Sequence, residues 1–388
     1  MSGFKTVKRE SVGAWIRKNY ASYDGNVTPL VRDAEHTMVE EFLDLGVTVP
    51  PRGYKRYGYA LSNLVAHLFA DRVGALGLGF EARLTNCGMA AIATALEVIP
   101  EVYDTTGAGI CIAGKVMYPE TPKLIAVYVD EEASLEDSGD LKGLLWFCEE
   151  FQGPYIMFFE TLGNGPSMPL LDVRGLFDAM WDREVVIVLD NTLLTCALLN
   201  PFEIYARIKG ERGNPVMKFV YVESLSKYYR VDENDPVTAG IIVASPKVIA
   251  ECDEIIARMG TYLQFPCLRE LPFDLYGACK ATMSDLSLRT GQVVASLRSH
   301  PKVKSVAYPD SLSGGVFFFT VDGDSSEVKV QMEREFGPSR GSFGHAESTW
   351  LPFGDATGGD PHVFRFAVGV NDSGDEVIAK LKRALDYC

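Results

Sequence analysis

Apolar residues along the chain follow two different spacings. Between residues 60 and 75 they recur at helical intervals, at Leu61, Leu64, Val65, Leu68, Phe69 and Val73. Six short and almost wholly apolar runs are predicted to be buried strands, at 109–114, 124–130, 155–160, 185–191, 218–224 and 239–245. Amphipathic helices are predicted between several of them, at 139–151 and 172–182. Apolar strands separated by helices indicate a mostly parallel sheet that helices cover on both faces.

The pattern changes after about residue 250. A long helical region at about 247–300 is followed by strand patterns at 303–309, 314–322 and 362–370, and by helices near 325–336 and 372–386. This second pattern predicts a smaller α+β domain. We therefore expect an N-terminal arm (1–57, with a helical stretch near 32–45), a large domain (58–250), and a smaller C-terminal domain with a long linking helix (251–388).

Polar residues gather where several predicted strands end. In sheets of this kind, ligands bind at the carboxyl ends of the strands. The residues at or just after these ends are Glu160 and Asn164, then Asp190, then Ser224, Ser226 and Lys227. Residues 85–89 lead into an apolar helix, and Gly88 permits a tight turn there. The free N–H groups at such a helix start suit a phosphate.

These residue types match the needs of pyridoxal phosphate (PLP). A lysine amine must form an imine with the cofactor aldehyde, and a carboxylate must keep the pyridine nitrogen protonated. Lys227 and Asp190 are the candidates for these two roles. Hydroxyl and backbone N–H groups must hold the phosphate, and an aromatic ring should stack on the cofactor. Each signal alone is weak, because lysines and strand-end aspartates are common at surfaces and in turns.

The order of the motifs is more specific than any one of them. Along the chain stand Tyr54-Lys55-Arg56, Cys87-Gly88-Met89-Ala90-Ala91, Tyr118-Pro119-Glu120-Thr121, Glu160-Thr161-Leu162-Gly163-Asn164, Asp190-Asn191-Thr192, Ser224-Leu225-Ser226-Lys227-Tyr228, Ser342-Phe343-Gly344 with Glu347-Ser348, and Arg365 within 364–370. Over about residues 54–386 this series resembles the Cys/Met-metabolism family of PLP enzymes, the group of cystathionine γ-synthase, cystathionine γ-lyase and methionine γ-lyase. At the seventh motif that family has Ser-Leu-Gly.

The resemblance implies PLP fold type I, the aspartate-aminotransferase-like fold, with catalytic roles for three residues. It implies that Lys227 carries the Schiff base, that Asp190 pairs with the pyridine nitrogen, and that Tyr118 stacks on PLP and transfers protons. By the same resemblance, Asn164 contacts the ring 3-oxygen and Arg365 binds the substrate α-carboxylate.

The resemblance also implies a site shared between subunits. The groups that it places around the phosphate are the backbone amides of Gly88 and Met89, with Ser224 and Ser226. Tyr54 and Arg56 would reach the site of a neighbouring subunit, with Tyr54 and Ser342 also facing the substrate. A shared site requires a homodimer at least, and the family is commonly a homotetramer built as a dimer of dimers.

Several departures indicate a specialised branch. Residues 230–235 differ from the family pattern, the connection from Asp190 to Lys227 is longer by roughly a dozen residues, and Pro119 and Glu120 replace two glycines. We expect γ-elimination or γ-replacement on a small amino acid, such as a γ-substituted or halogenated vinyl amino acid that yields an alkynyl amino acid. The alternatives are a cystathionine γ-synthase-like or γ-lyase-like enzyme, a β-eliminating or transaminating enzyme, and a degenerate PLP-fold binding protein.

Composition narrows the class of partner. The chain has 388 residues, a net charge of −15 and eight cysteines, without a CxxC pair. Its acidity argues against nucleic acid or an anionic membrane as partner, and the cysteine spacing predicts reduced core thiols without a metal. The absence of an 18-residue apolar run and of an apolar stretch near the N-terminus leads us to expect a cytoplasmic enzyme.

Overall fold

The structure is a computed structural model that describes residues 60–103, 110–129, 131–135, 140–150, 155–229, 237–309 and 314–386. The predicted arm at 1–57, with Tyr54 and Arg56, lies outside these residues. So does the altered segment at 230–235.

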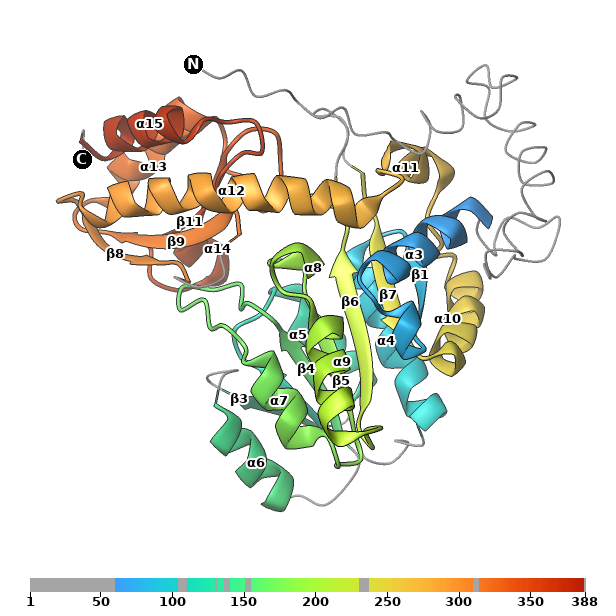
Figure 1. The fold of residues 1–388 in the computed structure, drawn as a ribbon. Coiled ribbons are helices and arrows are strands. Elements are labelled where there is room, and N and C mark those ends of the chain that lie inside the picture. Colours follow the sequence, from blue (N-terminus) through green and yellow to red (C-terminus); the bar gives the residue numbers. More distant parts are fainter. Residues whose placement is uncertain are drawn as a thin grey trace, which may run out of the picture.

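The larger part is built on a seven-stranded sheet with the order β1-β7-β6-β5-β4-β2-β3 (Figure 1). The strands are β1 (Glu81–Thr85), β2 (Ile110–Gly114), β3 (Glu131–Leu135), β4 (Tyr155–Glu160), β5 (Val185–Asp190), β6 (Lys218–Ser224) and β7 (Gly240–Ala244). Neighbouring strands run parallel, except that β7 is antiparallel to both β1 and β6. The predicted mostly parallel sheet is therefore confirmed.

Helices cover both faces of this sheet. They are α3 (Ala60–Arg72), α4 (Gly88–Tyr103), α5 (Glu120–Tyr128), α6 (Leu141–Glu150), α7 (Val173–Met180), α8 (Thr195–Leu198), α9 (Pro201–Arg212) and α10 (Pro246–Met259). The central strand β5 is buried along its whole length, with Val186 and Val188 in one apolar core and Ile187 and Leu189 in the other. The long connection between Asp190 and Lys227 is occupied by α8, α9 and β6.

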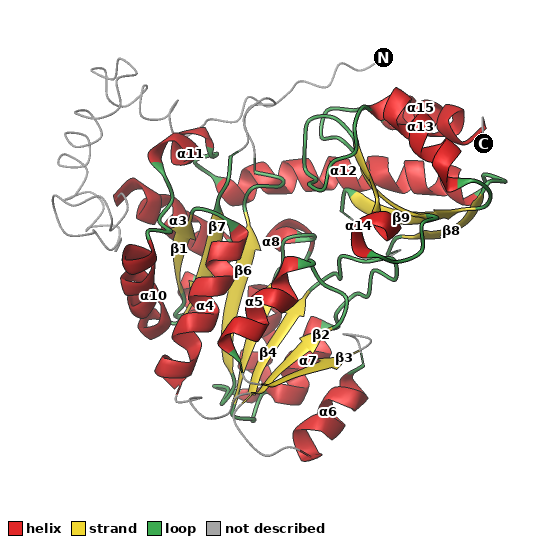
Figure 2. Ribbon diagram, turned by 180° about the vertical axis from the view of Figure 1, so that it is seen from behind, coloured by secondary structure: helices red, strands yellow, loops and turns green. Residues whose placement is uncertain are grey.

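A smaller sheet follows, with the order β10-β11-β9-β8 and antiparallel pairing throughout. Its strands are β8 (Val303–Ala307), β9 (Val316–Val321), β10 (Thr349–Pro352) and β11 (Val363–Ala367). Helix α11 (Phe265–Glu270) and the long helix α12 (Leu275–Arg298) lead to it, and α13 (Ser325–Phe336), α14 (Phe353–Thr357) and α15 (Gly374–Asp386) complete this part. Figure 2 shows α12, α13 and α15 on one side of the small sheet.

One predicted strand is wrong. The run 124–130 lies mostly in helix α5, and the strand that follows is β3. Within α5 only Thr121 and Ile125 are buried, one helical turn apart, whereas Val127 is 73% exposed. The periodicity of a short apolar run fits a buried strand and a helix equally well. Here the buried residues are four apart, which is the spacing of one face of a helix. The short strands β1 and β10 and helices α8, α9 and α14 were not predicted from the sequence.

The cysteines agree with the sequence prediction. All seven in the described part of the chain are free, and five of them are buried. None of the helices within the described ranges is long and apolar enough to cross a membrane.

Candidate active site

Three neighbouring parallel strands end at the site. Glu160, the last residue of β4, is the direct partner of Asp190, the last residue of β5, and Asp190 in turn is paired with Val222 of β6. Ser224 ends β6 three residues before Lys227. The sheet register therefore brings two carboxyl groups and the predicted Schiff-base lysine to the same edge, as expected for a ligand site in a parallel sheet.

Asp190 is a buried carboxylate with one oxygen already bound. The backbone N–H and the hydroxyl of Thr192 both donate to Asp190 Oδ1, at 2.9 and 2.6 Å. The same hydroxyl oxygen accepts a hydrogen bond from the Ser224 N–H at 2.9 Å, which ties β5 to the end of β6. Burial raises the pKa of Asp190, while the Thr192 hydrogen bonds and the charge of Lys227 act in the opposite direction. Within the described ranges, no hydrogen-bond donor to Asp190 Oδ2 is found, so this oxygen can accept from a ligand.

Glu160 holds two loops together. Its Oε1 accepts from the Tyr118 N–H at 2.6 Å, and its Oε2 accepts from the Asn164 N–H at 3.2 Å. Burial, together with the neighbouring charge of Asp190, raises the pKa of Glu160 well above its usual value. One side chain thus fixes the backbone at two predicted cofactor contacts.

Lys227 meets a loop that comes from the small sheet. Its Nζ donates to Ser342 Oγ at 3.1 Å and lies 4.8 Å from the centre of the Phe343 ring. Gly344, with φ of +76°, lies so close that a Cβ there would overlap the Lys227 carbonyl group. The loop therefore covers Lys227 along three consecutive residues.

Arg365 is placed on β11 next to the same loop. Its Nη2 donates to the Gly341 carbonyl oxygen at 2.5 Å, and its Nη1 lies 3.5 Å from Asn164 Oδ1. The side chain is buried, and burial lowers the pKa of Arg365 to about 10. A buried guanidinium with remaining donors is well suited to a carboxylate, which it can hold through two parallel hydrogen bonds.

The start of helix α4 lies against the end of β6. A Cβ on Gly88 would be 2.6 Å from Ser224 Cβ, so only glycine allows this approach without a shift. The Ala90 N–H donates to Cys87 Sγ at 3.3 Å, so the cysteine caps the helix where the family motif has serine. The hydroxyl of Ser226 donates to the carbonyl of Ala239 and accepts from its N–H. Ser226 therefore also braces the chain beside β7.

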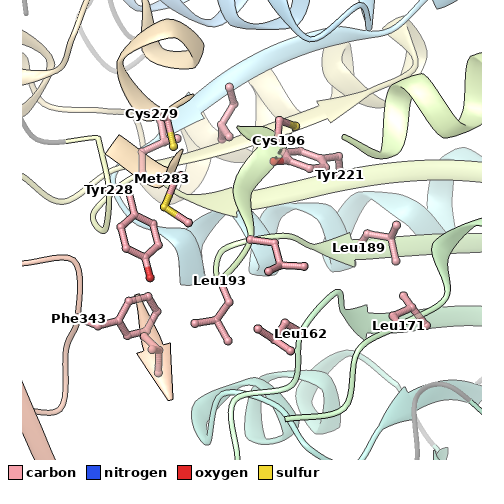
Figure 3. Close-up of a cluster of buried hydrophobic side chains, with 14 of the residues drawn as sticks. Leu162, Leu171, Leu189, Leu193, Cys196, Tyr221, Tyr228, Cys279, Met283 and Phe343 are labelled. Atoms are coloured by element: carbon pink, nitrogen blue, oxygen red, sulfur yellow. Dashed lines mark hydrogen bonds between the residues drawn. The ribbon is translucent and has the colours of Figure 1, made fainter. Parts of the chain in front are cut away.

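A cluster of buried apolar side chains lies next to these polar groups. Figure 3 shows Leu193 and Leu162 near Tyr228 and Phe343, with the hydroxyl end of Tyr228 directed toward the Phe343 ring. The two ring centres are 5.8 Å apart. Apolar surroundings of this kind strengthen the electrostatic interactions among the few charged groups that remain.

The residues present fit PLP. The buried carboxylate of Asp190 would hold the pyridinium, the Gly88–Met89 helix start would hold the phosphate, and Lys227 lies at the same sheet edge. Contacts link eight predicted residues, directly or through Thr192 and Glu160: Gly88, Tyr118, Asn164, Asp190, Ser224, Lys227, Ser342 and Arg365. Met89 and Ser226 adjoin Gly88 and Lys227 in sequence. Tyr54 and Arg56 lie in the part that the structure does not describe.

Other residues take places that sequence reasoning did not assign. Thr192, Glu160 and Phe343 all contact predicted site residues. Each lies within a recognised motif, so the signal was present, but their roles depend on side-chain directions that spacing does not give. Glu120, which replaces a family glycine, is exposed and pairs with Lys123 at 3.0 Å.

The groups at this edge of the sheet are those that a PLP enzyme needs, namely a lysine, a buried carboxylate and a free helix start. A sequence model described as Cys/Met metabolism PLP-dependent enzyme matches residues 49–317, which is more than half of the chain. The protein belongs to that family, and its cofactor is PLP. A comparison with curated proteins found no match.

Solved structures share the fold. The metB protein of Corynebacterium glutamicum and a cystathionine gamma synthase of Xanthomonas oryzae pv. oryzae each have a TM-score of 0.69 and 18% identity, over 87% of this chain and 88% of theirs. A methionine gamma lyase from Micromonospora echinospora has a TM-score of 0.66 and 19% identity, over 88% and 92%. At these identities the likeness establishes the fold, which is PLP fold type I as expected.

Proposed function

We propose that the protein catalyses elimination or replacement at the γ carbon of a small amino acid. The observation that carries this proposal is the approach of Lys227, just after strand β6, to the loop before β10. Lys227 binds Ser342 of that loop, and Lys227 and Arg365 of β11 both lie over the ring of Phe343. An amine-handling group and a carboxylate-binding group so close together suit an α-amino acid, whose amine and carboxylate share one carbon. The γ carbon is proposed from the family and from the cystathionine gamma synthase and methionine gamma lyase that share the fold.

Each residue then has a defined task. When bound, PLP supplies an electron-accepting ring that stabilises negative charge at the substrate carbon. Arg365 would hold the α-carboxylate and Lys227 would remove the proton from Cα. Asp190 would keep a proton on the pyridine nitrogen, and Thr192 keeps that carboxylate in place. Tyr118, 39% exposed, is the proposed proton donor to the leaving group.

The finer substrate assignment is also a proposal. We favour a γ-substituted or halogenated vinyl amino acid that yields an alkynyl product, because the chain departs from the family at residues 119, 120 and 230–235. An enzyme like cystathionine γ-synthase or γ-lyase, or a β-eliminating enzyme, is the main alternative. A degenerate binding protein is opposed by the joint presence of Lys227, Asp190 and Tyr118. That the enzyme works in the cytoplasm stays a prediction, which cell fractionation would test.

The first test is an absorbance spectrum of the purified protein with PLP. We expect a band near ~420 nm from the Schiff base at Lys227, and its loss in Lys227→Ala. Lys218→Ala is the matched control, because Lys218 is exposed at the opposite end of the same strand. Adding O-acyl-homoserine, cystathionine, homocysteine-type and γ-halogenated vinyl amino acids one by one should shift the band with one class only. A protein without the band in excess PLP would exclude the enzyme proposal.

A further inference from the structure

The ring of Phe343 lies close to two cationic side chains, those of Lys227 and Arg365. Lys227 Nζ is 4.8 Å and Arg365 Cζ is 5.7 Å from the centre of its ring. Both distances fall within the range of about 6 Å in which a cation is attracted to an aromatic face. The family motif that this segment resembles has leucine here, which has no such face.

The ring is held in place by its surroundings. Phe343 is 5% exposed and its ring centre lies 5.8 Å from that of Tyr228, the residue after Lys227. Its neighbours in sequence also contact Lys227, Ser342 through a hydrogen bond and Gly344 through the backbone. A buried ring attracts a cation more strongly than an exposed one, because less water competes for the charge.

We infer that Phe343 is a positioning residue that supports Lys227 and Arg365 on one aromatic ring and favours the protonated form of Lys227. The inference rests on the proposed function for the chemical role of Lys227. In that role Lys227 becomes an ammonium when it takes the Cα proton, so an interaction that stabilises the ammonium assists the proton transfer. The shared ring also fixes the spacing between the groups that handle the amine and the carboxylate of one substrate.

The test measures how readily Lys227 ionises in the full-length protein after its cofactor has been removed. Trace acetic anhydride acetylates only the neutral amine. The rate of labelling is read from the Lys227 peptide by mass spectrometry. Plotted against pH, this rate rises through a midpoint to a plateau. The midpoint reports ionisation and the plateau reports access of the reagent. A merely structural role for Phe343 would change the plateau and leave the midpoint where it was.

We expect Phe343→Leu to lower the midpoint by about 0.5 to 1 pH unit and to leave the plateau unchanged. Below the midpoint, labelling then becomes about 3- to 10-fold faster. Phe343→Tyr retains the ring and should retain the midpoint. Phe353→Leu is the matched control, because it removes a buried ring of helix α14 that packs on Phe318 of the small sheet.

Phe343→Met provides a second ringless variant if Phe343→Leu does not fold. A midpoint that stays unchanged in the ringless variants overturns the inference, and so does a change confined to the plateau. The spectrum of the unaltered protein with PLP tests the proposed function separately. If that spectrum lacked the band, the proposed function would fail, but the labelling experiment would still measure the effect of the Phe343 ring on Lys227.

Discussion

At the scale of single residues, Glu223 is a buried carboxyl group to which the proposed chemistry gives no role. Its side chain is 1% exposed, on the face of β6 opposite to Ser224. The hydroxyl groups of Tyr221 and Tyr229 both donate to it, the second at 2.5 Å. Tyr229 lies two residues after Lys227, so Glu223 ties the chain beyond the lysine to the strand before it. Burial raises the pKa of Glu223 to about 8.

This shifted pKa predicts that stability falls as the pH rises from the acid range to about 8. The pKa of the folded state is above that of an unfolded glutamate, about 4.3, so the folded chain binds the extra proton. Its contribution to the free energy of unfolding is complete below about pH 4.3 and is lost as the pH rises through about 8. The total is on the order of 5 kcal/mol.

The variant Glu223→Gln stays neutral at all pH values and should remove most of this dependence. Urea denaturation at pH 5, 7 and 9 should then show a smaller fall in unfolding free energy than in the unaltered protein. Glu251→Gln, an exposed residue on α10, is the control. Equal pH slopes in the protein and in Glu223→Gln would contradict the prediction.

At the scale of elements, the loop before β10 rests on the chain after β6 through Gly344. Its φ of +76° is in the left-handed region, and a Cβ at this position would also overlap the Lys227 backbone. Gly358 has nearly the same φ, +72°, but a Cβ added there would meet no atom within 4 Å. Both glycines therefore have a left-handed backbone conformation, but only Gly344 has other atoms next to the position of a Cβ.

Alanine at these two positions separates backbone strain from contact. Gly358→Ala should lower the free energy of unfolding by about 1–2 kcal/mol, from the left-handed conformation alone. Gly344→Ala should lower it by about 1–3 kcal/mol more, since the loop must move away from Lys227, and should weaken PLP binding. Urea denaturation and PLP titration measure both effects. Equal losses in the two variants would show that the contact with Lys227 contributes nothing.

The pattern of apolar residues predicted some strands of the large sheet correctly and missed others. Strands β4, β5 and β6 were predicted because buried strands of a parallel sheet are apolar throughout, and the motif residues follow their ends. The run 124–130 was misassigned because its composition fits both states. Strand β3, with the sequence Glu131-Glu132-Ala133-Ser134-Leu135, is at the sheet edge. Edge strands are often polar, so apolar runs do not reveal them.

The sequence predicted the site residues but not their contacts. Motif order, through the family resemblance, predicted that Asp190, Lys227 and Arg365 belong to one site, and their roles there stay a prediction. That Glu160 joins Tyr118 to Asn164, or that Phe343 lies beside two cations, depends on side-chain directions across strands far apart in sequence. Long-range packing of this kind has no local periodicity, so no pattern along the chain could show it.

At the scale of the whole molecule, we propose a dimer of dimers in which Tyr54 and Arg56 complete the site of a neighbouring subunit. Family membership supports this proposal. Light scattering should give a mass of about four times the chain mass of 42.6 kDa. A mass equal to one chain, in a protein that binds PLP fully, would exclude a shared site.

The two sheets are also joined by α12, one unbroken helix of 24 residues. It lies against α3 and α8 at the large sheet and against β8 and α15 at the small one (Figure 1). Tilting one sheet against the other would bend this helix or break its packing at one end. We therefore expect α12 to limit changes in the separation between Lys227, beside the large sheet, and Arg365, in the small sheet.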